Sequence, residues 1–229
     1  MWKHCSALVG GACDCHDLAW SAAAGLGQID LIVFSKQMAQ QLWADPQCKE
    51  ALVKNLTNAN VSVVNFYAGG GTIRTGLDSL ASAINEVGTL NMSFAWVAEI
   101  ERAPRCQKFL SACYPDAVIV AEAESCASGG PVLDVQSHTL VPCPSADLTI
   151  GGVLFGAMSG LNINRKSLRS CARTRTGGTG ETLGHVIDHT KQQRPRVVVV
   201  ENTPGFDKQV DFNDPEADSP MLACKSFFE

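Results

Sequence analysis

The stretch VSVVNFYAGGGTIRTGLDSLASAINEVG, residues 61–88, decides the fold. It begins with a short run of β-branched and aromatic residues, which predicts a buried strand. Three consecutive glycines, Gly69, Gly70 and Gly71, follow the run and permit a tight turn. After them, apolar residues recur at helical spacing as far as Ile84, which predicts a helix. A strand, a glycine turn and a helix in this order form the opening unit of a parallel α/β sheet.

The alternation of strand-like and helix-length segments continues along the chain. Two helix-length segments, 101–115 and 180–196, carry apolar residues at helical spacing, and the second stops at a cationic end beside Pro195. Strands of nearly continuous β-branched residues between such segments are typical of a parallel sheet with helices on both faces. We therefore predict a doubly wound, mostly parallel α/β fold. The further strand-like runs are SFAWVAEIE (93–101), PDAVIVAEA (115–123), DLTIGGVLF (147–155) and RPRVVVVENTPGF (194–206).

The pattern divides the chain into three parts. These are an N-terminal extension whose structure the pattern leaves open, an α/β domain and an acidic, solvated tail, at 1–58, 59–206 and 207–229. Within the extension, IDLIVF (29–34) fits either a strand or a buried turn, and two helical pieces follow it, broken at Pro46. Two segments of the α/β domain are expected to be flexible loops, 124–147 and the Arg-rich 160–180.

Composition excludes several classes of protein. The chain has 229 residues, of which 45% are hydrophobic, so it can bury a core and is not disordered as a whole. Its formal net charge of −5 gives no general attraction to a polyanion, so any DNA binding must rest on a local site. The apolar run near the N-terminus is short and interrupted by Asp14, and no stretch approaches the ~20 apolar residues of a membrane span. We expect an intracellular protein, nuclear or cytoplasmic, without a signal peptide or a membrane anchor.

The ten cysteines are scattered along the chain. Only Cys13 and Cys15 lie close together, with His16 beside them. A structural zinc site needs a second, similarly spaced pair, and the sequence has none. We therefore expect no metal site, and we expect thiols in a reducing compartment.

Three features in order predict a site for a nucleoside cofactor. The glycine turn lets a ligand approach the backbone closely, and Glu99 follows at the end of the second predicted strand. A carboxylate at that position accepts hydrogen bonds from ribose hydroxyls, and Asp134, further along, can accept one from an adenine amino group. The alternative is that both carboxylates are exposed and flank a purely structural turn.

Glu201 is the candidate catalytic group. It follows four valines directly and precedes Asn202, so it stands at the carboxyl end of a buried strand. Open α/β sheets hold their catalytic groups at that edge. A helix cap or a loop hydrogen bond is the alternative role.

In order and wording, these motifs resemble those of the DNA cytosine-5 methyltransferase family. The stretch VNFYAGGGTIRTGLDSL is similar to the first cofactor motif of that family, in which Tyr67 stands at an adenine-contacting aromatic position. Asn65 and Thr72 depart from that motif. WVAEIE resembles the second motif, LDV the third, ADLTIGG the strand before the catalytic loop, and VVVVENTPGF the Glu-Asn-Val motif. The resemblance covers 61–206 and implies a Rossmann-like methyltransferase fold that binds S-adenosyl-L-methionine. The implied cofactor-binding residues are Tyr67, Ala68, Gly69, Gly71, Glu99, Ile100, Asp134 and Val135.

The family's reaction takes place on a cytosine flipped out of DNA. A cysteine thiolate attacks C6 of the ring, the motif's glutamate, here Glu201, stabilises the proton at N3, and C5 then receives the methyl group. The resemblance also implies substrate-binding roles for Ser159, Asn202, Arg165 and Arg173. The basic segment around these arginines can contact phosphates, and a merely solvated loop is the alternative.

The catalytic loop departs from the family. In GGVLFGAMSGLN (151–162), Val153 and Leu154 replace two prolines and Phe155 replaces the cysteine. Phenylalanine cannot attack, titrate or donate a hydrogen bond. Cys143 precedes the strand and Cys171 lies in the Arg-rich segment, so neither occupies the position of the nucleophile. No counterpart of the family's target-recognition region or of its later motifs is visible in the sequence.

We therefore expect a methyltransferase-like protein that is impaired in DNA methylation, a pseudoenzyme if no other group replaces the thiol. Whether the chain is an enzyme stays open at this point. One alternative is a non-catalytic binding or regulatory module that offers the fold to a protein partner. Another is an active methyltransferase for a small molecule or a protein, for which no cysteine is needed.

Overall fold

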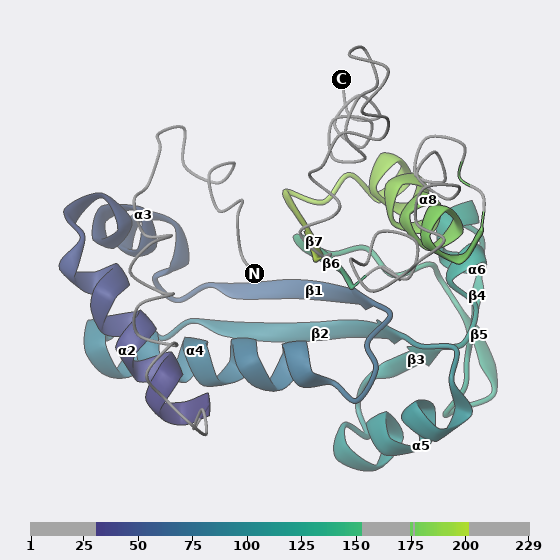
Figure 1. Ribbon diagram of the computed structural model, residues 1–229, viewed down its shortest axis with the longest axis horizontal. Coiled ribbons are helices and arrows are strands. Elements are labelled where there is room, and N and C mark those ends of the chain that lie inside the picture. The colour runs from purple at the N-terminus through teal and green to yellow at the C-terminus, as the bar shows by residue number, and fades with distance from the viewer. Residues whose placement is uncertain (1–30, 153–174, 176, 202–229) are drawn as a thin grey trace, which may run out of the picture. The chain divides into compact units, whose positions relative to one another are not determined.

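The computed structural model describes residues 31–152, 175 and 177–201. The helices are α2 (Leu31–Ala44), α3 (Pro46–Leu56), α4 (Thr72–Gly88), α5 (Pro104–Cys113), α6 (Ala123–Ser128) and α8 (Gly177–Gln193). The strands are β1 (Asn60–Phe66), β2 (Ser93–Ile100), β3 (Val118–Val120), β4 (Val132–Asp134), β5 (Thr139–Val141), β6 (Leu148–Gly152) and β7 (Val197–Glu201). Strands and helices alternate over most of this length, as the sequence predicts (Figure 1).

The described strands form one seven-stranded sheet in the order β5-β4-β3-β2-β1-β6-β7. The pairs β1–β6, β2–β3 and β6–β7 are parallel, whereas β3–β4 and β4–β5 are antiparallel. The prediction of a mostly parallel α/β sheet is thus confirmed, and the arrangement is compatible with a Rossmann-like fold.

The described residues group into two compact units. One comprises 63–70, 97–152, 175 and 177–201, and the other comprises 31–62 and 71–96. We refer to them as unit 1 and unit 2. The boundary predicted between residues 58 and 59 stays a prediction, and the tail at 207–229 lies outside the described residues.

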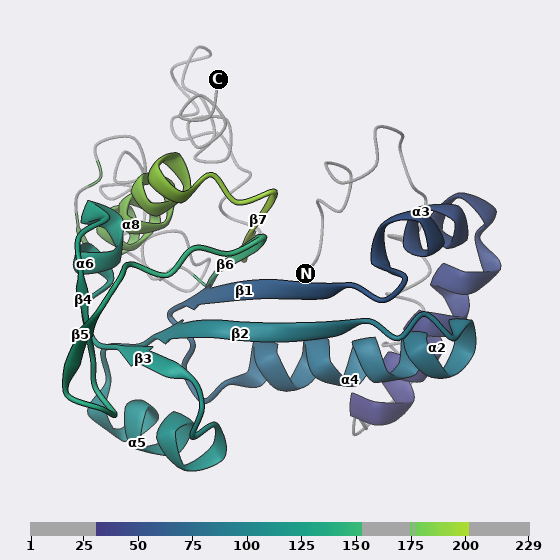
Figure 2. The ribbon, with the colours of Figure 1, turned by 180° about the vertical axis from the view of Figure 1, so that it is seen from behind.

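Alternating residues of the unit 1 strands face different helices. On β3, Val118 and Val120 belong to the core cluster that also contains residues of α6 and α8, whereas Ile119 packs with Leu110 of α5. Figures 1 and 2 show α6 and α8 on one face of these strands and α5 on the other. Successive side chains of a strand point to opposite faces, so one short apolar run contributes side chains to a core on each face of the sheet. The larger cluster joins Val64, Phe66, Ala98 and Ile100 to Leu183, Val186 and Ile187.

Helices α2 and α4 form the core of unit 2 through small residues. Ala39 of α2 and Ala81, Ala83 and Ile84 of α4 are buried in one cluster. Gly88, the last residue of α4, lies under the ring of Trp43, because a Cβ atom at Gly88 would come within 2.6 Å of the Trp43 Cη2. Small side chains let the two helix backbones approach closely.

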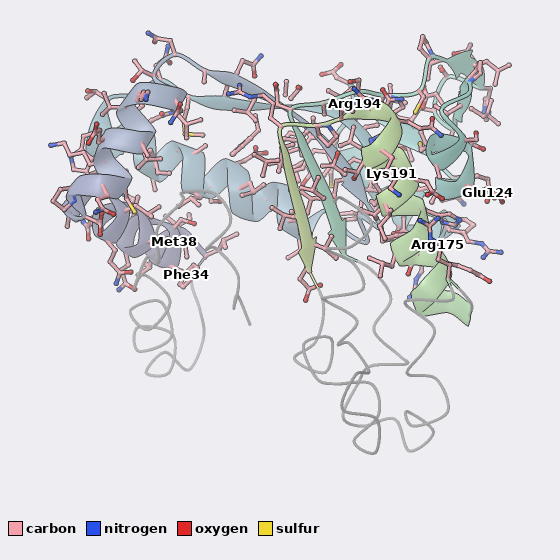
Figure 3. All side chains as sticks on the ribbon, turned by 90° about the horizontal axis from the view of Figure 1, so that it is seen from above. Phe34, Met38, Glu124, Arg175, Lys191 and Arg194 are labelled. Atoms are coloured by element: carbon pink, nitrogen blue, oxygen red, sulfur yellow. The ribbon has the colours of Figure 1, made fainter. Side chains whose placement is uncertain are left out.

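Two local predictions were wrong. IDLIVF was expected to be a strand or a buried turn, but Leu31 begins α2, and Ile32 is 61% exposed in the first turn of that helix. Figure 3 marks Phe34 and Met38, one helical turn apart on α2. Apolar residues in an exposed first turn imitate a short strand, and the sequence pattern cannot separate the two. The break before Pro46 is confirmed, since α3 begins there with Asp45 as its N-cap.

Segment 124–147 was expected to be a flexible loop, and this was also wrong. It holds most of α6 and the antiparallel pair β4–β5. Each strand has only three residues and α6 has six, which is too short for periodicity to show. Gly129, with φ of 71°, ends α6 in the left-handed conformation. Among the described residues, no helix has both the length and the apolar character needed to cross a membrane.

Gly151 is a contact point between β6 and α8. A Cβ atom at this position would lie 2.8 Å from the Val186 Cγ2, which is closer than side-chain atoms can pack. We therefore expect Gly151→Ala to lower the free energy of unfolding by about 1–3 kcal/mol in urea titrations, through overpacking.

Gly152→Ala is the matched control, since its Cβ would meet atoms only at 3.8 and 4.0 Å. We expect the free energy of unfolding of this control to change by less than about 1 kcal/mol. Adding Val186→Ala to Gly151→Ala should recover part of the loss. Equal effects of the two glycine substitutions would contradict the contact.

Candidate functional site

The sheet has a topological switch point between β1 and β6. The two strands are parallel neighbours, with Phe66 opposite Gly151, but the chain leaves β1 toward β2 and leaves β6 toward β7 on the other side. Ligands of open α/β sheets bind outside the carboxyl ends of the strands at such a point. The candidate site of unit 1 is therefore the edge of the sheet where β1, β6 and β7 end. It is formed by the residues that follow Phe66 and by the last residues of β6 and β7.

The glycine turn after β1 offers open space to a ligand. The backbone N–H groups of Tyr67 and Ala68 both donate to the Ile100 carbonyl, at 2.7 and 3.1 Å, which fixes the start of the turn. Gly69 has φ of 58°, and Cβ atoms built at Gly69 or Gly70 would meet nothing within 4 Å. Ala68 itself is buried against α5 rather than open. Gly71, with φ of 74°, is the N-cap of α4 and makes no side-chain capping hydrogen bond.

Glu101 holds this turn, and sequence reasoning missed it. Its Oε2 accepts a hydrogen bond from the Gly69 N–H at 2.7 Å, and its Oε1 accepts one from the Ala103 N–H at 2.7 Å. Ala103 is the N-cap of α5, so one carboxylate ties the glycine turn to the start of that helix. The sequence did carry a signal for Glu101. It is a carboxylate shortly before Pro104, and Pro104 stands at the first position of a predicted helix.

Glu99, the predicted ribose acceptor, is fully buried. The Asn65 Nδ2 donates to its Oε2 at 2.8 Å, and neither residue has exposed surface. An amide at position 65 suits this contact, because an aspartate there would set two carboxylates against each other. The Asn65 Oδ1 has no hydrogen-bond partner among the described residues. Ile100, the neighbouring predicted contact, is 1% exposed in the core. The ribose role of Glu99 stays a prediction.

Tyr67 connects β1 to α8. Its hydroxyl lies 3.0 Å from the His185 Nδ1 and 3.2 Å from the Thr182 carbonyl, to which it donates. Tyr67 has φ of 61°, a conformation that side-chain-bearing residues rarely adopt. Burial raises the pKa of this phenol, and the Glu181 carboxylate raises it further. The hydroxyl therefore stays neutral and acts as a hydrogen-bonding group. His185 was not predicted, and nothing in the spacing of α8 marks it.

Asp134, the predicted adenine contact, stabilises its own turn. Its Oδ1 accepts from the N–H groups of Ile119 and Gln136, each at 3.1 Å, and its Oδ2 accepts from the N–H and the hydroxyl of Ser137 at 3.2 and 2.6 Å. These four bonds match the usual capacity of a carboxylate. Burial alone would raise the pKa of Asp134, but the hydrogen bonds outweigh it and lower the pKa. Val135, the other predicted contact here, donates its N–H to the Ile119 carbonyl at 2.7 Å.

Glu201 lies at the switch-point edge, as predicted. It is opposite Gly152 in the β6–β7 register. A Cβ atom built at Gly152 would lie 4.0 Å from the Glu201 Oε2 and 3.8 Å from the Tyr67 carbonyl oxygen. The ends of three strands thus meet around Gly152, and Glu201 contributes a carboxylate there. Such a group can accept a proton from a ligand or hold one beside it.

Several predicted residues lie outside the described part of the chain. These are Cys13, Cys15, His16, Phe155, Ser159, Arg165, Cys171, Arg173 and Asn202. Of the Arg-rich segment, Arg175 is described, and its Nη1 lies 2.7 and 2.9 Å from the two carboxylate oxygens of Asp188 on α8. Figure 3 shows Arg175 beside α8, with Lys191 and Arg194 toward the end of that helix. The described residues contain no group of three or more His, Cys, Asp or Glu side chains placed to hold a metal.

The four hydrogen bonds of Asp134 make stability depend on pH. We expect Asp134→Asn to lower the free energy of unfolding at neutral pH by about 1–3 kcal/mol, because an amide oxygen cannot accept all four bonds. The folded-state pKa lies below the unfolded value of 3.8, so the carboxylate stabilises the fold above that pH. That advantage is lost as the pH falls through the folded-state value.

The difference between wild type and Asp134→Asn should therefore shrink in urea titrations carried out at progressively lower pH. Asp116→Asn is the control, because Asp116 is exposed and its substitution should change the free energy of unfolding by less than about 0.5 kcal/mol. A difference that stays constant down to the lowest pH would rule out the stabilising role of the carboxylate charge.

The geometry of the switch-point edge comes from this chain alone. A comparison of the sequence with protein-family models and with curated proteins finds no match.

Proposed function

We propose that this protein is a DNA cytosine-5 methyltransferase-like protein that binds S-adenosyl-L-methionine but is impaired in methyl transfer. The observation that carries the proposal is the position of Glu201, whose Oε2 lies 4.0 Å from the Cβ position of Gly152 at the switch point. Open α/β sheets bind ligands at this place, and the order of motifs along the chain is that of the methyltransferase family.

The residues fit the cofactor in part. The open space over Gly69 and Gly70 would accept a ligand close to the backbone. Asp134 accepts four hydrogen bonds from within the chain, which hold the turn. An adenine amino group could therefore bond to Asp134 only by replacing one of the hydrogen bonds from Ser137. When bound, S-adenosylmethionine supplies an electrophilic methyl group. The protein's part is to hold the nucleoside over the turn.

The proposed impairment lies in the catalytic loop. Methylation at C5 of cytosine requires a covalent addition at C6, because C5 of the free ring is a weak nucleophile. Glu201 can hold a proton near N3 of a flipped base, but a carboxylate in that role does not form the bond to C6. Phe155 stands at the position of the missing thiol and supplies no lone pair for the attack.

A second candidate function is a non-catalytic binding module that needs no cofactor. It is favoured because the side chains predicted to contact the ligand already form hydrogen bonds within the chain. Asp134 is bonded to its own turn, Glu99 to Asn65, and the Tyr67 hydroxyl to α8. Polar groups that are already paired gain less from a ligand.

Calorimetry with S-adenosylmethionine separates the two functions. We expect wild type to bind the cofactor and Gly70→Leu to bind it at least about tenfold more weakly, because the new side chain fills the space over the turn. Gly76→Leu is the matched control, since it adds the same side chain in open space on α4 and should bind like wild type. Absence of binding to wild type would overturn the cofactor site and favour the second candidate.

Reversion of the loop tests the impairment. In the presence of S-adenosylmethionine, we expect wild type to form no covalent complex with DNA containing 5-fluorocytosine, whereas Val153→Pro, Leu154→Pro and Phe155→Cys together restore one that survives denaturing electrophoresis. Adding Glu201→Ala to the reverted protein should reduce the amount trapped. Trapping by wild type would show that another group replaces the thiol, and no trapping by the reverted protein would place the defect outside the loop.

A further inference from the structure

Two cysteines lie close together beneath α8. Cys126 lies on α6 and is fully buried, and Cys143 lies between β5 and β6 and is partly buried. The Cys143 Sγ donates to the Cys126 carbonyl at 3.3 Å. Both are free cysteines. The Cys143 thiol is thus held against the backbone of Cys126, which stands 17 residues earlier in the chain.

The surroundings fix this contact. Cys126 belongs to the core cluster that contains Leu183 and Ile187 of α8, and Cys143 packs against the same cluster. At the end of α8, the Gln192 Nε2 donates to the carbonyl of Ala127, the residue that follows Cys126, at 2.6 Å. Both cysteines are therefore held by the helix that closes this core.

We propose that Cys126 and Cys143 form a reversible intramolecular disulfide when the protein meets a small disulfide such as oxidised glutathione. The motivating observation is the contact of the Cys143 thiol with the Cys126 backbone, in the core cluster that α8 covers. Disulfide formation needs the two sulfur atoms to come to bonding distance without a large backbone movement, and here the Cys143 Sγ already lies 3.3 Å from the Cys126 carbonyl oxygen.

The reaction proceeds in two exchange steps. Cys143, the more exposed thiol, loses its proton and its Sγ attacks one sulfur of the small disulfide, which releases one small thiol. Cys126 then loses its proton and its Sγ attacks the Cys143 Sγ, which releases the second small thiol. The protein pair is oxidised by two electrons, the small disulfide is reduced by two, and each thiolate released takes up one proton.

The surroundings of the two cysteines determine how fast the disulfide forms and how it changes the stability of the protein. Burial raises the pKa of the Cys126 thiol to about 12, and it also raises the pKa of the Cys143 thiol, so exchange is slow at neutral pH and mildly alkaline conditions favour it. The bond would close a short loop around the β4–β5 hairpin and join α6 to the segment that enters β6. Closing a loop removes conformations from the unfolded chain, so the oxidised protein is expected to be more stable.

The test uses the full chain, incubated with oxidised glutathione at mildly alkaline pH and then blocked with N-ethylmaleimide. Digestion before aspartate residues cuts the chain at Asp134, between the two cysteines, so the disulfide appears as a linked peptide pair in mass spectrometry. We expect the Cys126–Cys143 pair to form first and a reductant to remove it. The melting temperature of the oxidised protein should rise by roughly 6–12 °C.

Three controls make the result decisive. Cys143→Ser should abolish both the linked pair and the rise in melting temperature, whereas Cys113→Ser, at an exposed position on α5, should leave both unchanged. Oxidation of the urea-unfolded wild-type chain should give mixed pairings. Recovery of Cys126 and Cys143 as blocked single peptides from folded wild type, or joined only to other cysteines, would overturn the proposal even if a variant fails to fold.

Discussion

The close approach of α8 to the sheet at Gly151 is the constraint on which the rest of unit 1 depends. The Cβ position of Gly151 lies 2.8 Å from the Val186 Cγ2, so the helix rests against the strand backbone. At one end of α8 this brings Thr182 and His185 to the Tyr67 hydroxyl, and at the other end it brings Gln192 to α6. The missing side chain at Gly151 therefore sets the distance between α8 and the sheet, and with it the position of both ends of the helix.

The candidate site combines an open turn with carboxylates that are already engaged. Glu101 fixes the glycine turn, Asp134 fixes the β4 turn, and Glu99 is paired with Asn65. The bonds of Glu101 and Asp134 prearrange the backbone, which lowers the entropy that a ligand must remove when it binds. Each also competes with the ligand for an acceptor. Glu201 lies opposite Gly152, where the ends of β1, β6 and β7 meet at the switch point. The proposed function depends on it because open α/β sheets bind their ligands at this place.

Long, strongly patterned elements could be predicted from the sequence. The valine run of β7, the strand before the glycine turn and the break at Pro46 all follow from local rules, and all are confirmed. The α6–β4–β5 segment could not be predicted, because its elements are too short to show a period. The buried state of Glu99 and the contact between Tyr67 and His185 depend on which strands and helices become neighbours. Side-chain spacing carries no information on that.

The strand order also decides when the centre of the sheet can be completed. Val63 of β1 pairs with Leu148 of β6, so one side of β1 has no partner until the chain has been made as far as β6 and has closed a long loop. Closure of such a loop costs entropy before any contact is gained, and folds dominated by distant pairings form slowly. The central strand is thus synthesised early and paired late. During that interval its unpaired backbone edge is open to other chains, which makes the nascent chain more vulnerable than the finished fold.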